Sequence, residues 1–157
     1  MKINIRKGVE KDIKAALGLI QELADYEKAP QEVVVTEESM LKDGFGELAV
    51  YEFLVAEIDN AVVGIAVYFP TYSTWKGRAL HLEDLVVTQS HRRKGIGRLL
   101  FDTIVQVAQK TQTQRLTWQV LDWNSPAIEF YETLDANFDG EWINCKLTAS
   151  QIQNYSF

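Results

Sequence analysis

The chain has little of what stabilises secreted proteins or anchors membrane proteins. It contains one cysteine, Cys145, in 157 residues, which excludes an internal disulfide and is typical of a reducing compartment. Its longest apolar run, residues 61–69, is too short to cross a membrane. Residues 1–7 lack the apolar stretch of a signal peptide. We therefore expect a cytoplasmic protein without a membrane partner, with Cys145 as a small core residue.

Positive charge is also scarce. The chain has 16 Lys and Arg against 22 Asp and Glu, a net charge of −6 and an isoelectric point near 4.9. This balance argues against a nucleic-acid partner and is compatible with a cationic small substrate. The two histidines, His81 and His91, have no cysteine or further histidine nearby. The sequence therefore predicts no metal site.

The length suits one domain over residues 1–157, and 46% hydrophobic residues are enough for a core. No repeat, low-complexity tract or linker interrupts it. Apolar periodicity and turn residues predict alternating strands and helices, which indicate a mixed α/β sandwich. The expected strands are 2–6, 53–58, 62–69, 79–87, 114–121 and 140–147, and the expected helices are 9–26, 36–41, 95–109 and 125–134. We expect Thr36 to cap the second helix, and Asn124 or Ser125 to cap the last one with Pro126 in its first turn. Residues 59–60 are expected to form the turn between the second and third strands.

A basic, glycine-punctuated turn lies between the predicted strand 79–87 and the helix that follows it. The unpaired backbone N–H groups and the dipole at such a helix N-terminus form a site for a phosphate or pyrophosphate. Leu100 replaces the third glycine of a Rossmann fingerprint, and Arg98 replaces the lysine of a Walker loop. The alternative is an ordinary solvated turn. The residues of this turn are Arg92, Arg93, Lys94, Gly95, Ile96, Gly97 and Arg98.

Four further segments join this turn in a wider resemblance: residues 23–27 (LADYE), 43–46 (DGFG), 82–84 (LED) and 123–131 (WNSPAIEFY). Together they resemble the GNAT acetyltransferase superfamily, in particular its spermidine/spermine and thialysine acetyltransferase branch. The resemblance implies a twisted mixed sheet flanked by helices, with a splayed central strand pair. It also implies acetyl-CoA as cosubstrate, no metal, a small cationic amine as acceptor, and a homodimer.

The resemblance assigns the acetyl-CoA site to three segments. The basic turn would hold the pyrophosphate, and the backbone of Leu85, Val86 and Val87 would pair with the pantetheine amides. The start of the helix after residue 123 would line the pantetheine and phosphate arm, although these residues also suit plain helix capping. The residues of that third segment are Asn124, Ser125, Pro126, Ala127 and Tyr131.

The catalytic candidates are Glu83 and Tyr131. Glu83 and Asp84 are consecutive in a predicted strand, so we expect opposite faces, with at least one carboxylate in a cleft or paired. The resemblance places Glu83 toward the acceptor amine, with Asp84 supporting it; the alternative is a salt bridge to Arg78 or Arg115. Tyr131 matches the family's general acid, which protonates the departing thiolate; the alternative is a packed core aromatic.

The predicted acceptor-binding residues match residues of the polyamine site in similar enzymes. They are Tyr26, Glu27, Glu83 and Trp142. Two carboxylates could hold two ammonium groups, while Trp142, Trp75 or Tyr72 contributes cation–π contacts. A solvated helix end at residues 26–27 is the alternative. The leading acceptor is a di- or polyamine. Rival readings are thialysine, lysine or another amino acid, whose carboxylate Arg78 could bind, and a non-catalytic acyl-CoA sensor.

Two positions depart from the family pattern. Arg93 stands where similar proteins often carry glycine in the basic turn, and Asp135 replaces a glycine common after the last catalytic helix. At Asp135 we expect a left-handed backbone, which aspartate tolerates less well than glycine. Neither change removes a catalytic group.

Overall fold

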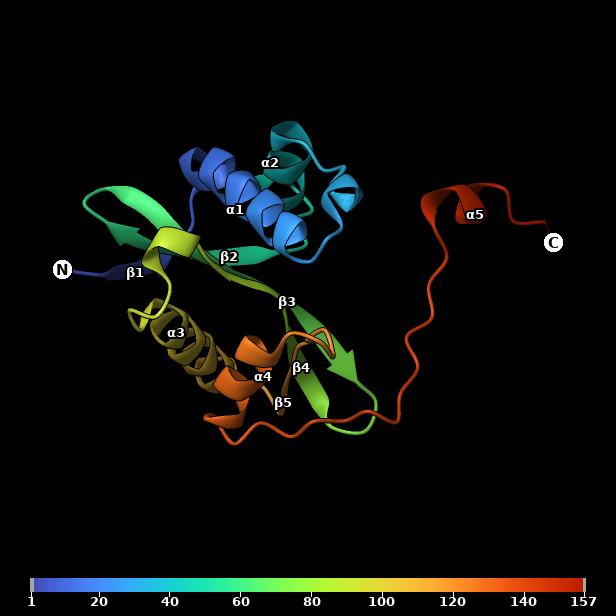
Figure 1. The fold of residues 1–157 in the computed structure, drawn as a ribbon. Coiled ribbons are helices and arrows are strands. Elements are labelled where there is room, and N and C mark those ends of the chain that lie inside the picture. The colour runs from blue at the N-terminus through green and yellow to red at the C-terminus, as the bar shows by residue number, and fades with distance from the viewer. Residues whose placement is uncertain (1, 157) are drawn as a thin grey trace. The chain divides into compact units, whose positions relative to one another are not determined.

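Five strands form one mixed sheet in the computed structural model, which describes residues 2–156 (Figure 1). The strand order follows the chain, with antiparallel neighbours from the first strand to the fourth and a parallel last pair. With helices against it, this sheet confirms the predicted fold class. The strands are β1 (Asn4–Lys7), β2 (Glu52–Ile58), β3 (Ala61–Ser73), β4 (Gly77–Val87) and β5 (Arg115–Thr117).

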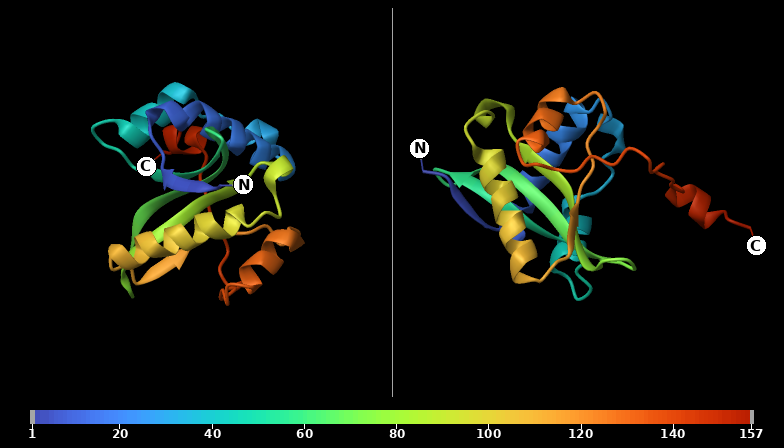
Figure 2. Two further views of the ribbon diagram at one scale, coloured as in Figure 1. Left: turned by 90° about the vertical axis from the view of Figure 1, so that its left-hand side faces the viewer. Right: turned by 90° about the horizontal axis from the view of Figure 1, so that it is seen from below.

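Helices cover both faces of the sheet (Figures 1 and 2): α1 and α2 lie on one face and α3 on the other. Thr36 caps α2 as predicted, its hydroxyl accepting from the Ser39 N–H at 3.1 Å. The α-helices are α1 (Ile13–Tyr26), α2 (Glu37–Phe45), α3 (Ile96–Lys110), α4 (Ser125–Glu132) and α5 (Ala149–Gln153). The 3₁₀ turns are η1 (Glu10–Asp12), η2 (Pro30–Glu32) and η3 (Gln89–His91).

The core beneath α1 explains why the sheet forms here. Ile13, Ala16 and Leu19 recur on one side of the helix and are buried in the same cluster as Ile65 and Val67 of β3. The apolar side chains on one side of the helix pack against the alternate side chains on one face of the strand, so both elements bury apolar surface at their contact. The turn at 59–60 between β2 and β3 has positive φ at both residues, as two-residue hairpins require.

The chain divides into two units, residues 1–119 and 120–157, which are described separately. In the second unit Asn124 caps α4 by accepting from the Ala127 N–H at 3.4 Å, and Pro126 lies in the first turn, as predicted. The predicted strand 140–147 is wrong. These residues are exposed and outside any strand of the described chain, because apolar alternation makes a strand only where a neighbour supplies backbone partners. Cys145 is likewise exposed, not a core residue.

The parallel β4–β5 ladder is short. It runs from the Ala79–Arg115 pair to the His81–Thr117 pair and ends there, while β4 continues to Val87. The predicted strand 114–121 therefore reaches only residues 115–117. Beyond His81, β4 has no β5 partner in its ladder, as expected for a splayed central pair. This edge is where the sequence places the residues that would pair with pantetheine.

A β-bulge at the same point of β4 changes which side chains share a face. Val67 pairs with Asp84 and Phe69 pairs with His81, so one extra residue is inserted in β4. Because Val67 and Phe69 share a face of β3, His81 and Asp84 also share that face, although they are three residues apart. Glu83 reaches His81 on it, with Oε2 3.4 Å from Nε2. The prediction that Glu83 and Asp84 point to opposite faces is therefore wrong.

Candidate active site

The basic turn leaves the N-terminus of α3 open. Gly95 caps the helix with a left-handed φ of 79°, and no side chain of the described residues caps it. The first turn closes when the Leu99 N–H donates to the Gly95 carbonyl at 3.1 Å. A Cβ at Gly95 would meet nothing within 4 Å, and one at Gly97 would meet only Val87 Cγ2 at 3.9 Å. Exposed N–H groups at an open helix start suit a diphosphate.

Arg92 is fixed against the protein by three groups. Its Nε donates to the Val87 carbonyl at 2.9 Å, its Nη2 lies 3.5 Å from Glu22 Oε1, and its guanidinium lies 5.2 Å from the centre of the Tyr26 ring. The neighbouring Arg93 has a left-handed φ of 63°, a conformation that glycine adopts without strain. The backbone here therefore suits the glycine that the family resemblance leads one to expect at this position.

Lys94 and Arg98 extend the positive charge of the turn. Lys94 Nζ donates to the Ser90 carbonyl at 3.0 Å, and Arg98 Nε donates to Asp102 Oδ1 at 2.8 Å. The latter pair is one helical turn apart and exposed, so it contributes little to stability. The turn thus presents several cations beside free helix N–H groups, the combination that binds phosphate oxyanions.

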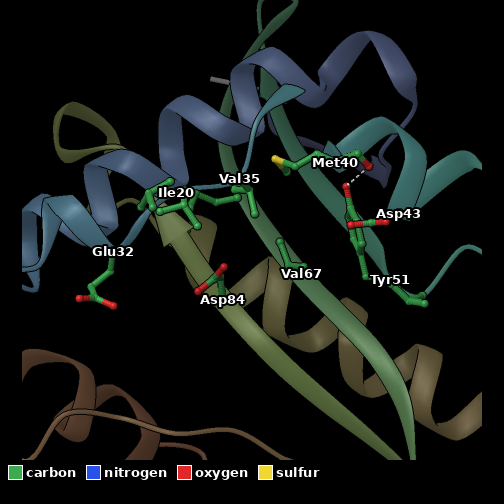
Figure 3. Close-up of a pocket in the computed structure, with 11 residues that line it drawn as sticks. Ile20, Glu32, Val35, Met40, Asp43, Tyr51, Val67 and Asp84 are labelled. Atoms are coloured by element: carbon green, nitrogen blue, oxygen red, sulfur yellow. Dashed lines mark hydrogen bonds between the residues drawn. The ribbon is translucent and has the colours of Figure 1, made fainter. Parts of the chain in front are cut away.

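A cavity of about 350 Å³ lies between α1, α2 and the sheet (Figure 3). Figure 3 shows Asp84 and Val67 on adjacent strands, with Ile20 and Val35 above them. Tyr51 closes one side, where its hydroxyl donates to the Met40 carbonyl at 2.7 Å. The walls are mainly apolar, and every charged residue among them is acidic. The lining residues are Ile20, Glu32, Val33, Val34, Val35, Met40, Asp43, Val50, Tyr51, Val67 and Asp84.

Asp84 is the most perturbed carboxyl of the cavity. Burial, reinforced by the negative charges of Glu83 and Glu27, raises the pKa of Asp84 to about 6. Burial also raises the pKa of Glu27 above its ordinary value. The structure therefore brings together three carboxyls from β4 and the end of α1. A positive charge placed among them would relieve their mutual repulsion.

The partner of Glu83 differs from the predicted alternative. Glu83 contacts His81 and not Arg78 or Arg115; the His81 Nε2 lies 3.4 Å from Glu83 Oε2, and its Nδ1 lies 3.0 Å from Thr117 Oγ1. The Glu83 side chain is 56% exposed, whereas Asp84 lines the cavity. The sequence interpretation treated Asp84 only as a support for Glu83. It also missed Glu32 and Asp43, because nothing in their spacing indicates a common cavity.

The remaining predicted residues lie in the second unit or outside the cavity lining. Tyr131 lies on α4, its ring centre 5.3 Å from that of Phe130. Trp142 is 71% exposed on the extended segment after α4, and Trp75 and Tyr72 are exposed near the β3–β4 connection. Asp135 adopts the expected left-handed φ, at 54°. The functional roles assigned to these residues remain predictions.

Among residues 2–156, no helix combines the length and the apolar character that crossing a membrane requires. No group of three His, Cys, Asp or Glu side chains in this part of the chain could hold a metal ion.

Comparison with known proteins fixes the family. The model of the acetyltransferase (GNAT) family matches residues 19–135. A thialysine N-epsilon-acetyltransferase from Bos taurus is 42% identical over 142 residues, covering 85% of this chain and 84% of that protein. A human spermidine/spermine N(1)-acetyltransferase-like protein is 33% identical over 148 residues, covering 88% of this chain and 21% of that protein.

Solved structures agree with the fold. An integron cassette protein from V. cholerae superposes with a TM-score of 0.79 at 23% identity, covering 98% of this chain and 96% of the other. The strand order, the open start of α3 and the sequence matches point to one conclusion. The chain belongs to the acetyltransferase (GNAT) family and is an N-acetyltransferase.

Proposed function

We propose that this enzyme transfers the acetyl group of acetyl-CoA to a terminal primary amine of a small aliphatic compound with a second amino group. The observation that carries the proposal is Asp84, a half-buried carboxyl in a mainly apolar cavity whose other charged residues are also acidic. A desolvated carboxylate among apolar walls selects an alkylammonium ion, because the chain buries apolar surface while the charges pair.

The leading acceptor is a diamine or polyamine. One ammonium group would pair with Asp84, and a second would pair with Asp43 or Glu32 elsewhere on the lining. An amino acid brings a carboxylate, which these three acidic side chains would repel. Tyr26 and Glu27 would contribute at the end of α1, and Trp142 would contribute an aromatic face.

Thialysine is the second candidate, supported by the relatives of that name at 38–42% identity from three mammals. Its side-chain amine is chemically close to the end of a diamine, so the same carboxyls would bind it. The α-carboxylate would then need a cation. Arg78 is exposed and outside the cavity lining, so in this reading the carboxylate points out of the cavity.

The chemistry requires the acceptor to lose a proton. An alkylamine with a pKa near that of lysine is only about 0.1% neutral at pH 7.4, and only the neutral amine is nucleophilic. Glu83, mostly exposed and next to Asp84, would accept this proton and pass it to water. Tyr131, on the resemblance of residues 123–131, would donate a proton to the departing sulfur; a phenol of pKa about 10 can protonate a thiolate when held close to it.

Acetyl-CoA, the cosubstrate of the family, supplies an activated thioester. Its diphosphate would bind the α3 N-terminus at Gly95, Ile96 and Gly97, with charge from residues 92–94 and 98. The part of β4 beyond the β5 ladder, with Leu85, Val86 and Val87, would bind the pantetheine amides by strand addition on the side opposite β3. Asn124, Ser125, Pro126 and Ala127 are assigned to the same arm by resemblance.

A homodimer is part of the proposal. Support comes from the exposed apolar side chains between residues 138 and 147, which include Phe138, Trp142, Ile143 and Leu147. A second copy could cover these side chains and remove their apolar surface from water. Light scattering coupled to size-exclusion chromatography tests this, with a mass of 17.9 kDa contradicting it.

The decisive experiment measures thiol release from acetyl-CoA with putrescine, spermidine, spermine, thialysine, lysine and butylamine. We expect the highest kcat/KM for a compound with two amino groups and weak turnover of butylamine, which has one. Asp84→Asn should raise the KM of the best acceptor by about tenfold or more, with the KM of acetyl-CoA unchanged. Tight acetyl-CoA binding without turnover of any amine would instead support an acyl-CoA sensor.

A further inference from the structure

A contact cluster between α1 and the basic turn lies outside the cavity lining and centres on Glu22, a residue assigned to neither substrate site. Glu22, on α1, accepts a hydrogen bond from the Gln89 backbone N–H at 2.7 Å through Oε1. The same oxygen lies 3.5 Å from Arg92 Nη2. The side chains of Glu22 and Arg92 are only 32% and 36% exposed, so water screens their attraction less than at an open surface.

Arg92 also contacts two further elements, the end of β4 and the end of α1. Its Nε donates to the Val87 carbonyl at the end of β4, and its guanidinium lies over the Tyr26 ring. Glu22 and Tyr26 are four residues apart, so they project from one side of α1. We name Glu22, Tyr26, Gln89 and Arg92 the α1–turn clamp. It ties the segment just before Gly95 to a rigid helix and to the end of a strand.

The turn needs such support because its backbone is unusual. Arg93 and Gly95 both have positive φ, at 63° and 79°. For arginine this conformation carries a conformational cost, so the turn would relax toward other geometries without contacts that hold it. A diphosphate site built from backbone N–H groups depends on those groups already pointing to one place.

We infer that Glu22 is a positioning residue for acetyl-CoA: it holds Gln89 and Arg92 so that the turn at Gly95–Gly97 is preformed for the diphosphate. This inference rests on the proposed role of the turn. Glu22 itself, as an anion, would repel the diphosphate, so its contribution is indirect. Losing it should weaken cosubstrate binding while leaving acceptor binding nearly unchanged.

The test uses two substitutions in the full chain, with acetyl-CoA affinity measured by calorimetry and both KM values measured by thiol release. Glu22→Ala should raise the Kd of acetyl-CoA about tenfold, the effect of losing one charge-assisted contact. Glu22→Gln should raise it only about threefold, because the amide oxygen still accepts from the Gln89 N–H. The KM of the amine should change by less than about twofold. The matched controls are Glu38→Ala and Glu38→Gln on the exposed first turn of α2.

Each outcome decides the inference. An unchanged acetyl-CoA Kd in both variants overturns it. A lowered Tm with equal losses for acetyl-CoA and the amine also overturns it, since that pattern indicates a purely structural residue. If Glu22→Ala fails to fold, Glu22→Gln, which keeps shape and acceptor, carries the same comparison. Wild-type protein that does not bind acetyl-CoA would refute the proposed function instead, whereas normal wild-type binding with unaffected variants refutes only the clamp.

Discussion

Neutralising Asp84 should make the protein more stable at neutral pH. The folded environment raises the pKa of this carboxyl from 3.8 to about 6, because burial and two nearby carboxylates disfavour its charged form. A shift of that size corresponds to about 3 kcal/mol between the protonation states. Water at the mouth of the cavity reduces the cost, so we expect Asp84→Asn to raise the free energy of unfolding by about 1–3 kcal/mol at pH 7.5.

The sign of the pH dependence is fixed by the direction of the shift. Between pH 3.8 and 6 the folded state keeps the Asp84 proton that the unfolded chain releases. The contribution of Asp84 to stability is therefore complete below about pH 3.8 and is lost as the pH rises through about 6. Asparagine carries no charge at any pH. The advantage of Asp84→Asn should thus be largest at pH 7.5, about half as large near pH 5, and about one fifth as large at pH 4.

Urea unfolding followed by circular dichroism at pH 4, 5, 6 and 7.5 measures this difference. Taking variant minus wild type at each pH cancels other titrations, such as that of Asp12, whose pKa the Arg6 hydrogen bond lowers. Asp59→Asn, in the exposed β2–β3 turn where φ is 50°, is the matched control and should show no pH-dependent gain. A pH-independent difference, or a loss of stability at pH 7.5, would refute the interpretation that partial burial and neighbouring carboxylates raise the pKa of Asp84.

Substitutions at three further positions test the diphosphate turn, the proposed acid and the backbone after α4. Gly97→Ala should leave the free energy of unfolding unchanged or raise it by up to about 1 kcal/mol, since the added Cβ has room within the protein. Gly97→Val should weaken acetyl-CoA binding at least tenfold. Calorimetry that shows wild-type affinity for Gly97→Val would contradict the diphosphate assignment. Tyr131→Phe should keep acetyl-CoA affinity and lower kcat by about 10²–10⁴-fold, and an unchanged kcat would remove Tyr131 from the reaction. Asp135→Gly should raise the free energy of unfolding by about 0.5–1 kcal/mol through relief of the left-handed backbone, and a lower Tm would contradict this.

The parts of the fold that depend on local patterns could be predicted from the sequence. Apolar spacing identified α1 and α3, and the turn residues identified the hairpin at 59–60. Thr36 was recognised as a cap, and the cap of α4 was narrowed to Asn124 or Ser125, of which the structure has Asn124. Each of these features is determined by neighbours within a few residues of the chain. The basic turn was found for the same reason, because its glycines and cations are consecutive.

Features that depend on distant partners could not be predicted. The bulge in β4 arises from the register with β3, and an alternation rule applied to residues 83–84 alone gives the wrong face. Residues 140–147 have the apolar composition of a strand, yet backbone partners decide whether one forms. The cavity joins residues from 20 to 84, so Glu32 and Asp43 could be recognised only in three dimensions.

The β4 bulge determines which face of the sheet carries the acidic side chains. By inserting one residue, β4 turns His81, Glu83 and Asp84 toward the α1 face, where Glu27 also lies close enough to affect Asp84. Without it, strict alternation would remove Asp84 or His81 from that face, and the acidic cluster would be divided between two faces of the sheet. Such a cluster opposes folding through desolvation and repulsion. The proposed cationic acceptor would offset both effects. Binding an ammonium group would then remove the destabilisation that Asp84 causes in the unliganded protein, and this gain would favour ammonium groups over neutral ligands.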